Sequence, residues 1–202
     1  KDNKPRYANY GKGVTYWETD AQAGTYVNLP GLDITSADIY WFTDNNSCGQ
    51  WEGGMLFTGG ARALTATECH RAANYGSTVE RLKALDARDG VRKPLWNYVE
   101  IGHPFSESDW PSIQPAEIKA AVWHSLIAGA QGIVYFNHSF GGPCPTQHAL
   151  REACYAAQRT AVTEVNAQIS QLAPVLNSPT ASGYATISGG GLKTLTKNYN
   201  NS

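Results

Sequence analysis

The sequence has little charge and no long apolar run. Charged residues make up 16% of the 202 residues, against about 25% in an average protein, and the net charge is −1. This balance gives no electrostatic reason to expect a nucleic acid or an anionic membrane as partner. No apolar run approaches the roughly 20 residues that a membrane-spanning helix needs, and residues 1–20 lack the apolar core of a signal peptide. Because the chain opens on Lys1, we expect it to begin inside a longer or processed polypeptide.

The sequence also lacks the C-x-x-C spacing of a zinc site, although it has four cysteines. They form two local pairs, Cys48/Cys69 and Cys144/Cys154, which are 21 and 10 residues apart. Two disulfides that each close a loop in an exported protein are favoured over four free thiols, and both alternatives stay open here. Secretion would also suit the possible glycosylation acceptors, although such short matches are common by chance. They are Asn45, Asn137 and Asn200.

The order of apolar patterns predicts an α/β fold with a parallel sheet. A weak or missing helix is expected between the first two strands, where residues 14–30 read as a loop with a short helix at most. After the second strand, residues 43–68 read as a long loop. The predicted strands are Pro5–Tyr10, Ile34–Phe42, Lys93–Gly102 and Ile133–Phe136, and the predicted helices are Thr65–Leu85, Pro115–Gly129 and Gln147–Leu176.

The last predicted strand and the C-terminal segment carry two further predictions. Ile133–Phe136 is apolar throughout, which is typical of a strand buried on both faces. From Ser178 the pattern changes, and Ala185/Ile187 with Leu192/Leu195 around Gly189–Gly191 read as a β-hairpin. We therefore expect one domain over residues 1–177 and the incomplete start of a β-rich domain over 178–202.

The stretch Lys93–Gly102 ends on an acid. Its residues alternate between an aliphatic face and a face that carries Trp96, Tyr98 and Glu100, and Gly102 then helps to stop the strand. Parallel α/β enzymes place their chemistry at the carboxyl ends of strands. Glu100 is therefore either a functional carboxylate or a solvated residue at a strand end.

Four β–α units in about 175 residues equal half of a (β/α)8 barrel. Four strands cannot close that barrel, so two architectures remain: an open sheet, or the C-terminal half of a barrel (strands 5–8) whose first half lies elsewhere. The internal start and the trailing β segment favour the half barrel.

A resemblance to a known family supports the half barrel. Ala120–Phe136, with its helix, Ala-Gly-Ala-Gln-Gly passage and aliphatic-aromatic strand, resembles the step into strand 8 of clan A glycoside hydrolases of the β-galactosidase type. Lys93–Gly102 would then be strand 7, Asp33–Tyr40 resembles strand 6 with its approach, and Arg6–Val14 more weakly resembles strand 5. The resemblance covers residues 4–177.

The resemblance implies a retaining glycosidase in which Glu100 is the nucleophile. The family's acid/base is a Glu on strand 4, which this sequence does not contain, so we expect the chain to be inactive without an N-terminal half-barrel from the same polypeptide or a second chain. Asn9 and Tyr98 are the candidates to donate hydrogen bonds that keep Glu100 ionised. We expect no cofactor and no metal, because no His/carboxylate spacing indicates one.

Several other residues are candidates for carbohydrate binding because aromatic rings stack on the apolar faces of sugars and polar side chains pair with hydroxyls. Asp44, Glu107 and Asp109 read as ordinary loop acids, and Trp123 reads as core. The candidates are Asp38 and Tyr40 on the inner face of the second strand; Trp41, Trp51 and Trp110, with Trp17 and Trp96 more generally; His103 and His138 after the last two strands; and Phe136.

Two competing interpretations remain. The chain could belong to a non-catalytic carbohydrate-binding or structural barrel module of an extracellular or particle-surface protein, which keeps the barrel without the acid/base. It could also be an open α/β sheet with unrelated chemistry. A Glu at the end of a strand 4 upstream of Lys1 would favour the enzyme.

Overall fold

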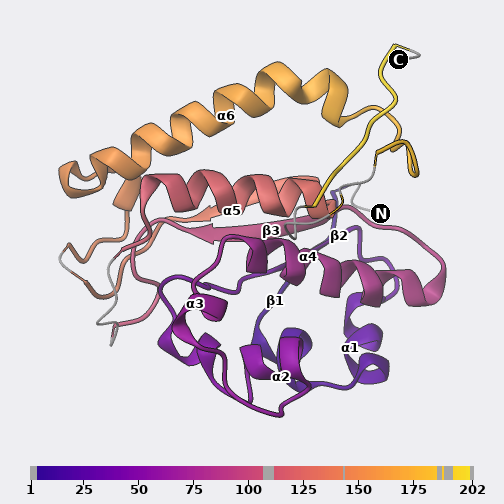
Figure 1. Cartoon of the computed structure of the whole chain (residues 1–202), viewed down its shortest axis with the longest axis horizontal. Coiled ribbons are helices and arrows are strands. Elements are labelled where there is room, and N and C mark those ends of the chain that lie inside the picture. The colour runs from indigo at the N-terminus through magenta and orange to yellow at the C-terminus, as the bar shows by residue number, and fades with distance from the viewer. Residues whose placement is uncertain (1–3, 107–111, 143, 186–187, 189–192, 201–202) are drawn as a thin grey trace.

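The fold is a mixed α/β arrangement built on a four-stranded parallel sheet (Figure 1). The computed structural model describes residues 4–106, 112–142, 144–185, 188 and 193–200. The strands are β1 (Tyr7–Tyr10), β2 (Ile34–Ala37), β3 (Leu95–Glu100) and β4 (Gly132–Phe136), and the helices are α1 (Asp20–Val27), α2 (Gly53–Thr58), α3 (Ala66–Cys69), α4 (Ala73–Asp86), α5 (Pro115–Ala128) and α6 (Ala156–Leu176).

The strands lie in the order in which they occur in the sequence, and each neighbouring pair is parallel. Parallel neighbours require crossovers, and α4 and α5 supply the two after β2 and β3. The predicted parallel α/β class is confirmed. All strands therefore end at one edge of the sheet, which is called the carboxyl edge below.

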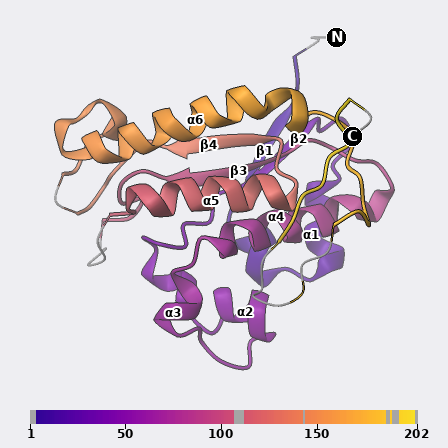
Figure 2. The same ribbon diagram turned by 45° about the horizontal axis from the view of Figure 1, so that its top comes forward.

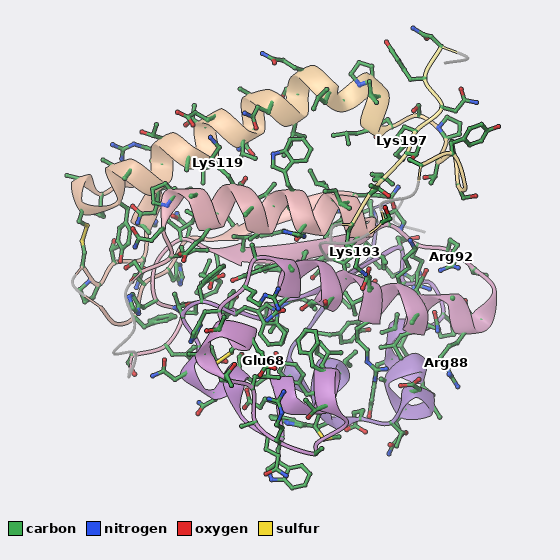
Figure 3. The ribbon with its side chains drawn as sticks, in the orientation of Figure 1. Glu68, Arg88, Arg92, Lys119, Lys193 and Lys197 are labelled. Atoms are coloured by element: carbon green, nitrogen blue, oxygen red, sulfur yellow. A yellow bond between two sulfur atoms is a disulfide. The ribbon has the colours of Figure 1, made fainter. Side chains whose placement is uncertain are left out.

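Helices α4 and α5 pack on β3, and α6 packs on α5 beside β4 (Figure 2). The ends of α5 follow from local chemistry: Pro115 occupies its first turn, Gln114 and Glu117 form a capping box, and Gly129 ends it at a φ of 113°. Lys119 on α5 also pairs with Glu164 on α6 at 2.9 Å (Figure 3).

The core divides into a large and a small cluster. The large cluster lies between the sheet and the helices, where Tyr75, Val99 and Ile118 are fully buried. The small one joins α1, α4 and the amino end of β3 through Val27, Leu82 and Leu95, among others. None of the described helices is long and apolar enough to cross a membrane.

The observed strands differ from the predicted ones by two residues at the start of β1 and at each end of β3, and the differences at β2 and β4 have identifiable reasons. The predicted strand Ile34–Phe42 stops at Ala37, because the backbone amides of Trp41 and Phe42 turn toward the hydroxyl of Tyr75 and the carboxylate of Glu100. The strand at Ile133–Phe136 begins at Gly132 and is half-buried along its whole length, so the prediction of burial on both faces is wrong. As the last strand of the described sheet, β4 has a neighbouring strand on one side only.

The connecting segments contain more helix than the sequence predicted. The region after β1 forms a helical turn (Gly13–Trp17) and then α1, which Thr19 and Gln22 cap. The long loop after β2 includes a turn at Asn45–Cys48 and α2, and the predicted helix Thr65–Leu85 is two helices, α3 and α4, with residues 70–72 between them.

The last long helix is shorter than predicted. Two turns, Ala149–Arg151 and Ala153–Tyr155, precede α6, and the helix therefore begins nine residues after its predicted start at Gln147. It continues through Pro174.

The C-terminal segment carries one antiparallel bridge, between Thr180 and Lys197, and it lies beside the ends of α5 and α6 (Figure 1). Ile187, Leu192 and the three glycines of the predicted hairpin lie outside the described residues. A separate β-rich domain over 178–202 stays a prediction.

Candidate functional site

Glu100 lies at the carboxyl end of β3 and is completely buried. Its Oε1 accepts hydrogen bonds from the backbone amide of Phe42 and from the hydroxyl of Thr43, both at 3.2 Å. Its Oε2 accepts a hydrogen bond from the hydroxyl of Tyr75 at 2.5 Å. The segment after β2 and the helix α4 thus hold the carboxyl group from two sides.

These donors carry no formal charge, and this decides how the acid ionises. Burial without a cation raises the pKa of Glu100 to about 7, against the opposing effects of the hydrogen bonds from Tyr75 and Phe42. Near neutral pH the group is therefore present in both its protonated and its ionised form.

The predicted donors to Glu100 were wrong. The hydroxyl of Tyr98 accepts from Tyr7 at 3.1 Å, and Asn9 Oδ1 accepts from Ser36 at 2.6 Å. These side chains form a hydrogen-bonded row across β1, β2 and β3 on the face of the sheet that also carries Trp96. The alternation in β3 correctly predicts Trp96 and Tyr98 on one face, but it gives no information about the donors from other segments.

Asp38 and Tyr40 follow β2, so their predicted place on the inner face of that strand is wrong, but the two side chains still lie close to one another. Burial raises the pKa of the Asp38 carboxyl, while the nearby polar groups of Asn9 and Tyr40 work in the opposite direction. Tyr40 is 4% exposed, and its own pKa is raised by burial, then by the nearby charges of Asp38 and Glu100. Tyr40 is therefore near enough to both carboxyl groups for their charges to affect it.

An aromatic group covers the carboxyl edge beyond β4. The ring of Phe136 lies 5.1 Å from that of Tyr40 and 5.7 Å from that of His138, between ring centroids. Phe105 and the exposed Phe140 extend the group on either side. The structure thus brings together the predicted residues Tyr40, Phe136 and His138.

Lys12 is a part of this edge that the sequence analysis missed. Its ammonium lies 2.7 Å from a carboxylate oxygen of both Asp44 and Glu52, and 5.6 Å from the ring centroid of Phe105. Asp44, predicted to be an ordinary loop acid, is 2% exposed and also accepts from the amide of Asn46. No local pattern joins Lys12 to acids 32 and 40 residues away, so only the fold shows the cluster.

The predicted tryptophans lie in different environments. Trp41 is fully buried and its indole donates to Thr78, so it has no free face for a sugar. Trp51 is 66% exposed, and its carbonyl accepts from the indole of Trp17 at 2.7 Å. Trp110 lies outside the described residues, as do the loop acids Glu107 and Asp109.

His103 is also fully buried, and neither ring nitrogen has a hydrogen-bond partner among the described residues. Burial lowers its pKa. The backbone of Gly142 packs directly on the imidazole, since a Cβ at that position would lie 2.4 Å from the ring. His103 therefore belongs to the interior, and a sugar hydroxyl has no access to it in this structure.

Both local cysteine pairs form disulfides, Cys48–Cys69 and Cys144–Cys154. Each closes a loop that follows the carboxyl end of a strand, β2 in one case and β4 in the other. Two disulfides in one domain indicate an oxidising environment.

No protein-family model matches this chain, and no curated protein matches it either. The functional argument therefore depends on the geometry of the carboxyl edge. That edge combines a buried acid, a second, half-buried carboxyl group and an aromatic surface.

Proposed function

We propose that this chain contributes the half of a retaining glycosidase active site that carries the nucleophile, with β1–β4 as the last four strands of a (β/α)8 barrel. The observation that carries the proposal is the position of Glu100, a carboxyl group with three hydrogen-bond donors at the end of the third of four sequentially ordered parallel strands. A carbohydrate is the substrate, and the other half of the barrel is the partner. The two disulfides suit a secreted or extracellular protein.

The open sheet supports the half-barrel part of the proposal. β1 and β4 are its outer strands, so each keeps one row of backbone groups that no strand in the described chain pairs. The inner face carries aromatic and polar side chains, and Tyr7 on it is 42% exposed. A barrel closed by four further strands would use both edges and enclose this face.

In this mechanism the ionised Glu100 attacks the anomeric carbon and forms a glycosyl ester, while an acid from the other half protonates the departing oxygen. That second group then takes a proton from water, which cleaves the ester. The donors from Phe42, Thr43 and Tyr75 hold the carboxylate in place. Because Glu100 is enclosed here, substrate binding must displace side chains around it. Tyr40 is a candidate for this displacement because the charges of both Asp38 and Glu100 affect it.

The complete burial of Glu100 favours one alternative, a non-catalytic barrel module that binds carbohydrate or serves as structure. In that case Glu100 is a structural acid that joins β3 to α4 and to the segment after β2. The aromatic surface formed by Phe136, His138 and Phe140 would then be the contact with sugar.

The deciding experiment uses the polypeptide or assembly that includes the other half of the barrel. Glu100→Ala should lower glycosidase activity by about 10³-fold or more, as loss of a nucleophile does in other enzymes. Azide should restore turnover in that variant and give a glycosyl azide of inverted configuration. Glu164→Ala, on the exposed side of α6, is the control and should keep full activity.

Mechanism-based labelling separates the two functions. A 2-fluoro glycoside that forms a stable ester on Glu100 supports the enzyme. Labelling of another carboxylate, or unchanged activity in Glu100→Ala, rejects the assignment. Retention on immobilised polysaccharide with no labelling and no turnover supports the binding module.

A further inference from the structure

The disulfide Cys48–Cys69 lies against an imidazole. Cys48 ends the turn after β2, Cys69 is the last residue of α3, and His70 follows it directly. The sulfur of Cys48 is 3.6 Å from Nε2 of His70, and one ligand atom from each of the three residues lies within 4.8 Å of the other two. Figure 3 marks the region with Glu68, the residue before Cys69.

The hydrogen bond on the other ring nitrogen fixes the tautomer of His70. Nδ1 lies 2.8 Å from the carbonyl oxygen of Trp41. A carbonyl can only accept, so Nδ1 carries the proton, and in the neutral imidazole the lone pair is on Nε2, the atom that faces Cys48. A backbone carbonyl that orients an imidazole in this way is the usual outer partner of a metal-binding histidine.

The backbone around the three residues is held by bonds that do not involve sulfur. The amide of Leu64 donates to the carbonyl of Cys48 at 2.8 Å. The side-chain amide of Asn74 donates to the carbonyl of Cys69 at 2.7 Å. α3 is capped by a reciprocal pair of Thr65 and Glu68. Reduction of the disulfide therefore leaves both cysteines near His70.

We propose that the reduced pair Cys48/Cys69 and Nε2 of His70 bind one Zn²⁺, with water as the fourth ligand. A reductant supplies two electrons and breaks the S–S bond. A dithiol gives its two protons to the sulfurs and becomes a disulfide, whereas a phosphine reacts together with one water, which supplies the two protons and the oxygen of the phosphine oxide. Zn²⁺ then displaces the two thiol protons. Zn–S bonds of about 2.3 Å in a tetrahedral site place the sulfurs about 3.8 Å apart, within the spread of the three residues.

Burial suits a site of this kind. Cys69 is fully buried, while Cys48 and His70 are half-buried, so an ion can enter from one side and keep a water ligand. The sequence predicts no metal because no His/carboxylate spacing indicates one, and neither cysteine pair has the C-x-x-C spacing of a zinc site; the fold brings the three candidate ligands together.

The proposed zinc site contacts the segment after β2 that donates hydrogen bonds to Glu100. Trp41, whose carbonyl orients His70, precedes Phe42 and Thr43, which donate to the carboxylate. Zinc would fix the turn at Cys48 to α3 as the disulfide does, and so preserve these donors under reducing conditions.

The second disulfide provides the matched control. Among the described residues, no group of three potential ligands includes Cys144 or Cys154. The double variant Cys144→Ser/Cys154→Ser keeps only the proposed site, and Cys48→Ser/Cys69→Ser keeps only the control pair. Both are reduced with a phosphine, freed of it without oxygen, and titrated with Zn²⁺ by calorimetry and with Co²⁺ by absorption spectroscopy.

The proposal expects one Zn²⁺ per chain and sulfur-to-cobalt charge-transfer bands in Cys144→Ser/Cys154→Ser only. His70→Gln removes one ligand but can still donate a hydrogen bond to the carbonyl of Trp41. Loss of an outer partner alone costs ~10–100-fold in metal affinity, so loss of this ligand should weaken Zn²⁺ binding by at least that much. Equal binding by both double variants overturns the proposal, and so does unchanged affinity in His70→Gln. Loss of fold on reduction that Zn²⁺ does not restore, seen by circular dichroism, also overturns it.

Discussion

The two ends of β3 each hold a buried acid, and the two acids have different partners. At the amino end, Asp86 is 1% exposed and lies 2.8 Å from the ammonium of Lys93. At the carboxyl end, Glu100 has only neutral donors, and its pKa is raised to about 7. Asp86 is thus paired with a cation, whereas Glu100 has neutral hydrogen-bond donors. Asp86, at the amino end of β3, is therefore a structural acid, whereas Glu100, at the carboxyl end, can change its charge near neutral pH.

The largest effect should come from breaking the ion pair at the amino end. Asp86→Ala leaves the buried ammonium of Lys93 without its nearest charge and should lower the free energy of unfolding by about 3–5 kcal/mol. Urea denaturation measures this. A loss below 1 kcal/mol would mean that the two ends do not differ as described.

The second prediction concerns the pH dependence at the carboxyl end. The folded pKa of Glu100 is raised from 4.5 to about 7, so the folded state binds more protons than the unfolded state between these values. The stabilisation is complete below about 4.5 and is lost as the pH rises through 7, a change of about 3 kcal/mol. The unfolding free energy of wild type minus that of Glu100→Gln, measured at a series of pH values, should therefore decrease as the pH rises from about 4.5 to above 7.

Glu164→Gln, which changes an exposed acid on α6, is the control for that measurement and should show no such slope relative to wild type. A flat difference for Glu100→Gln would show that the acid keeps one charge state across this range.

A third change tests the donors themselves. Tyr75→Phe removes the hydrogen bond that most strongly lowers the pKa of Glu100, so that pKa should rise further. The unfolding free energy should fall by about 1–3 kcal/mol, the usual cost of depriving a buried acceptor of its partner. Carbon-13 NMR titration of the Glu100 carboxyl measures the first effect. Tyr135→Phe, which loses a hydroxyl paired with Asn166 at the surface, should leave the titration unchanged.

The smallest effect is expected at Asp89, the outer acid near Lys93. Its carboxylate is 3.9 Å from the ammonium and 38% exposed, so Asp89→Asn should cost about 0–1 kcal/mol, as exposed pairs do. Thermal unfolding of this variant beside Asp86→Ala shows whether burial or mere proximity gives the pair its strength. Equal losses would assign the effect to proximity.

Sequence reasoning predicted the parts of this molecule that depend on neighbours along the chain. Pro115 and Gly129 place the ends of α5, and alternation in β3 places Trp96 and Tyr98 on one face. The predicted strand beyond Ala37 was wrong although its alternation continues, because Tyr75 and Glu100, 34 and 58 residues from their partners, take the backbone amides of Trp41 and Phe42.

The same limit applies to the candidate site. Glu100 could be selected as an acid at a strand end, and the cysteine pairing could be favoured from spacing. The donors to Glu100, the cluster around Lys12 and the approach of His70 to Cys48 depend on contacts between distant segments. No periodic pattern encodes them, so they could not be found before the fold was known.

The positions of the two disulfides have a consequence for how the protein responds to a reducing agent. Both cross-links lie in the loops at the carboxyl edge, and neither joins two strands or holds the amino edge. A reducing agent should therefore free the loop between Cys144 and Cys154 first, while the region of Cys48 and Cys69 keeps its backbone hydrogen bonds and the sheet keeps its core. Opening of that loop and unfolding would be two events, and a reduced sample should retain its far-ultraviolet circular dichroism after the loop beyond β4 has opened.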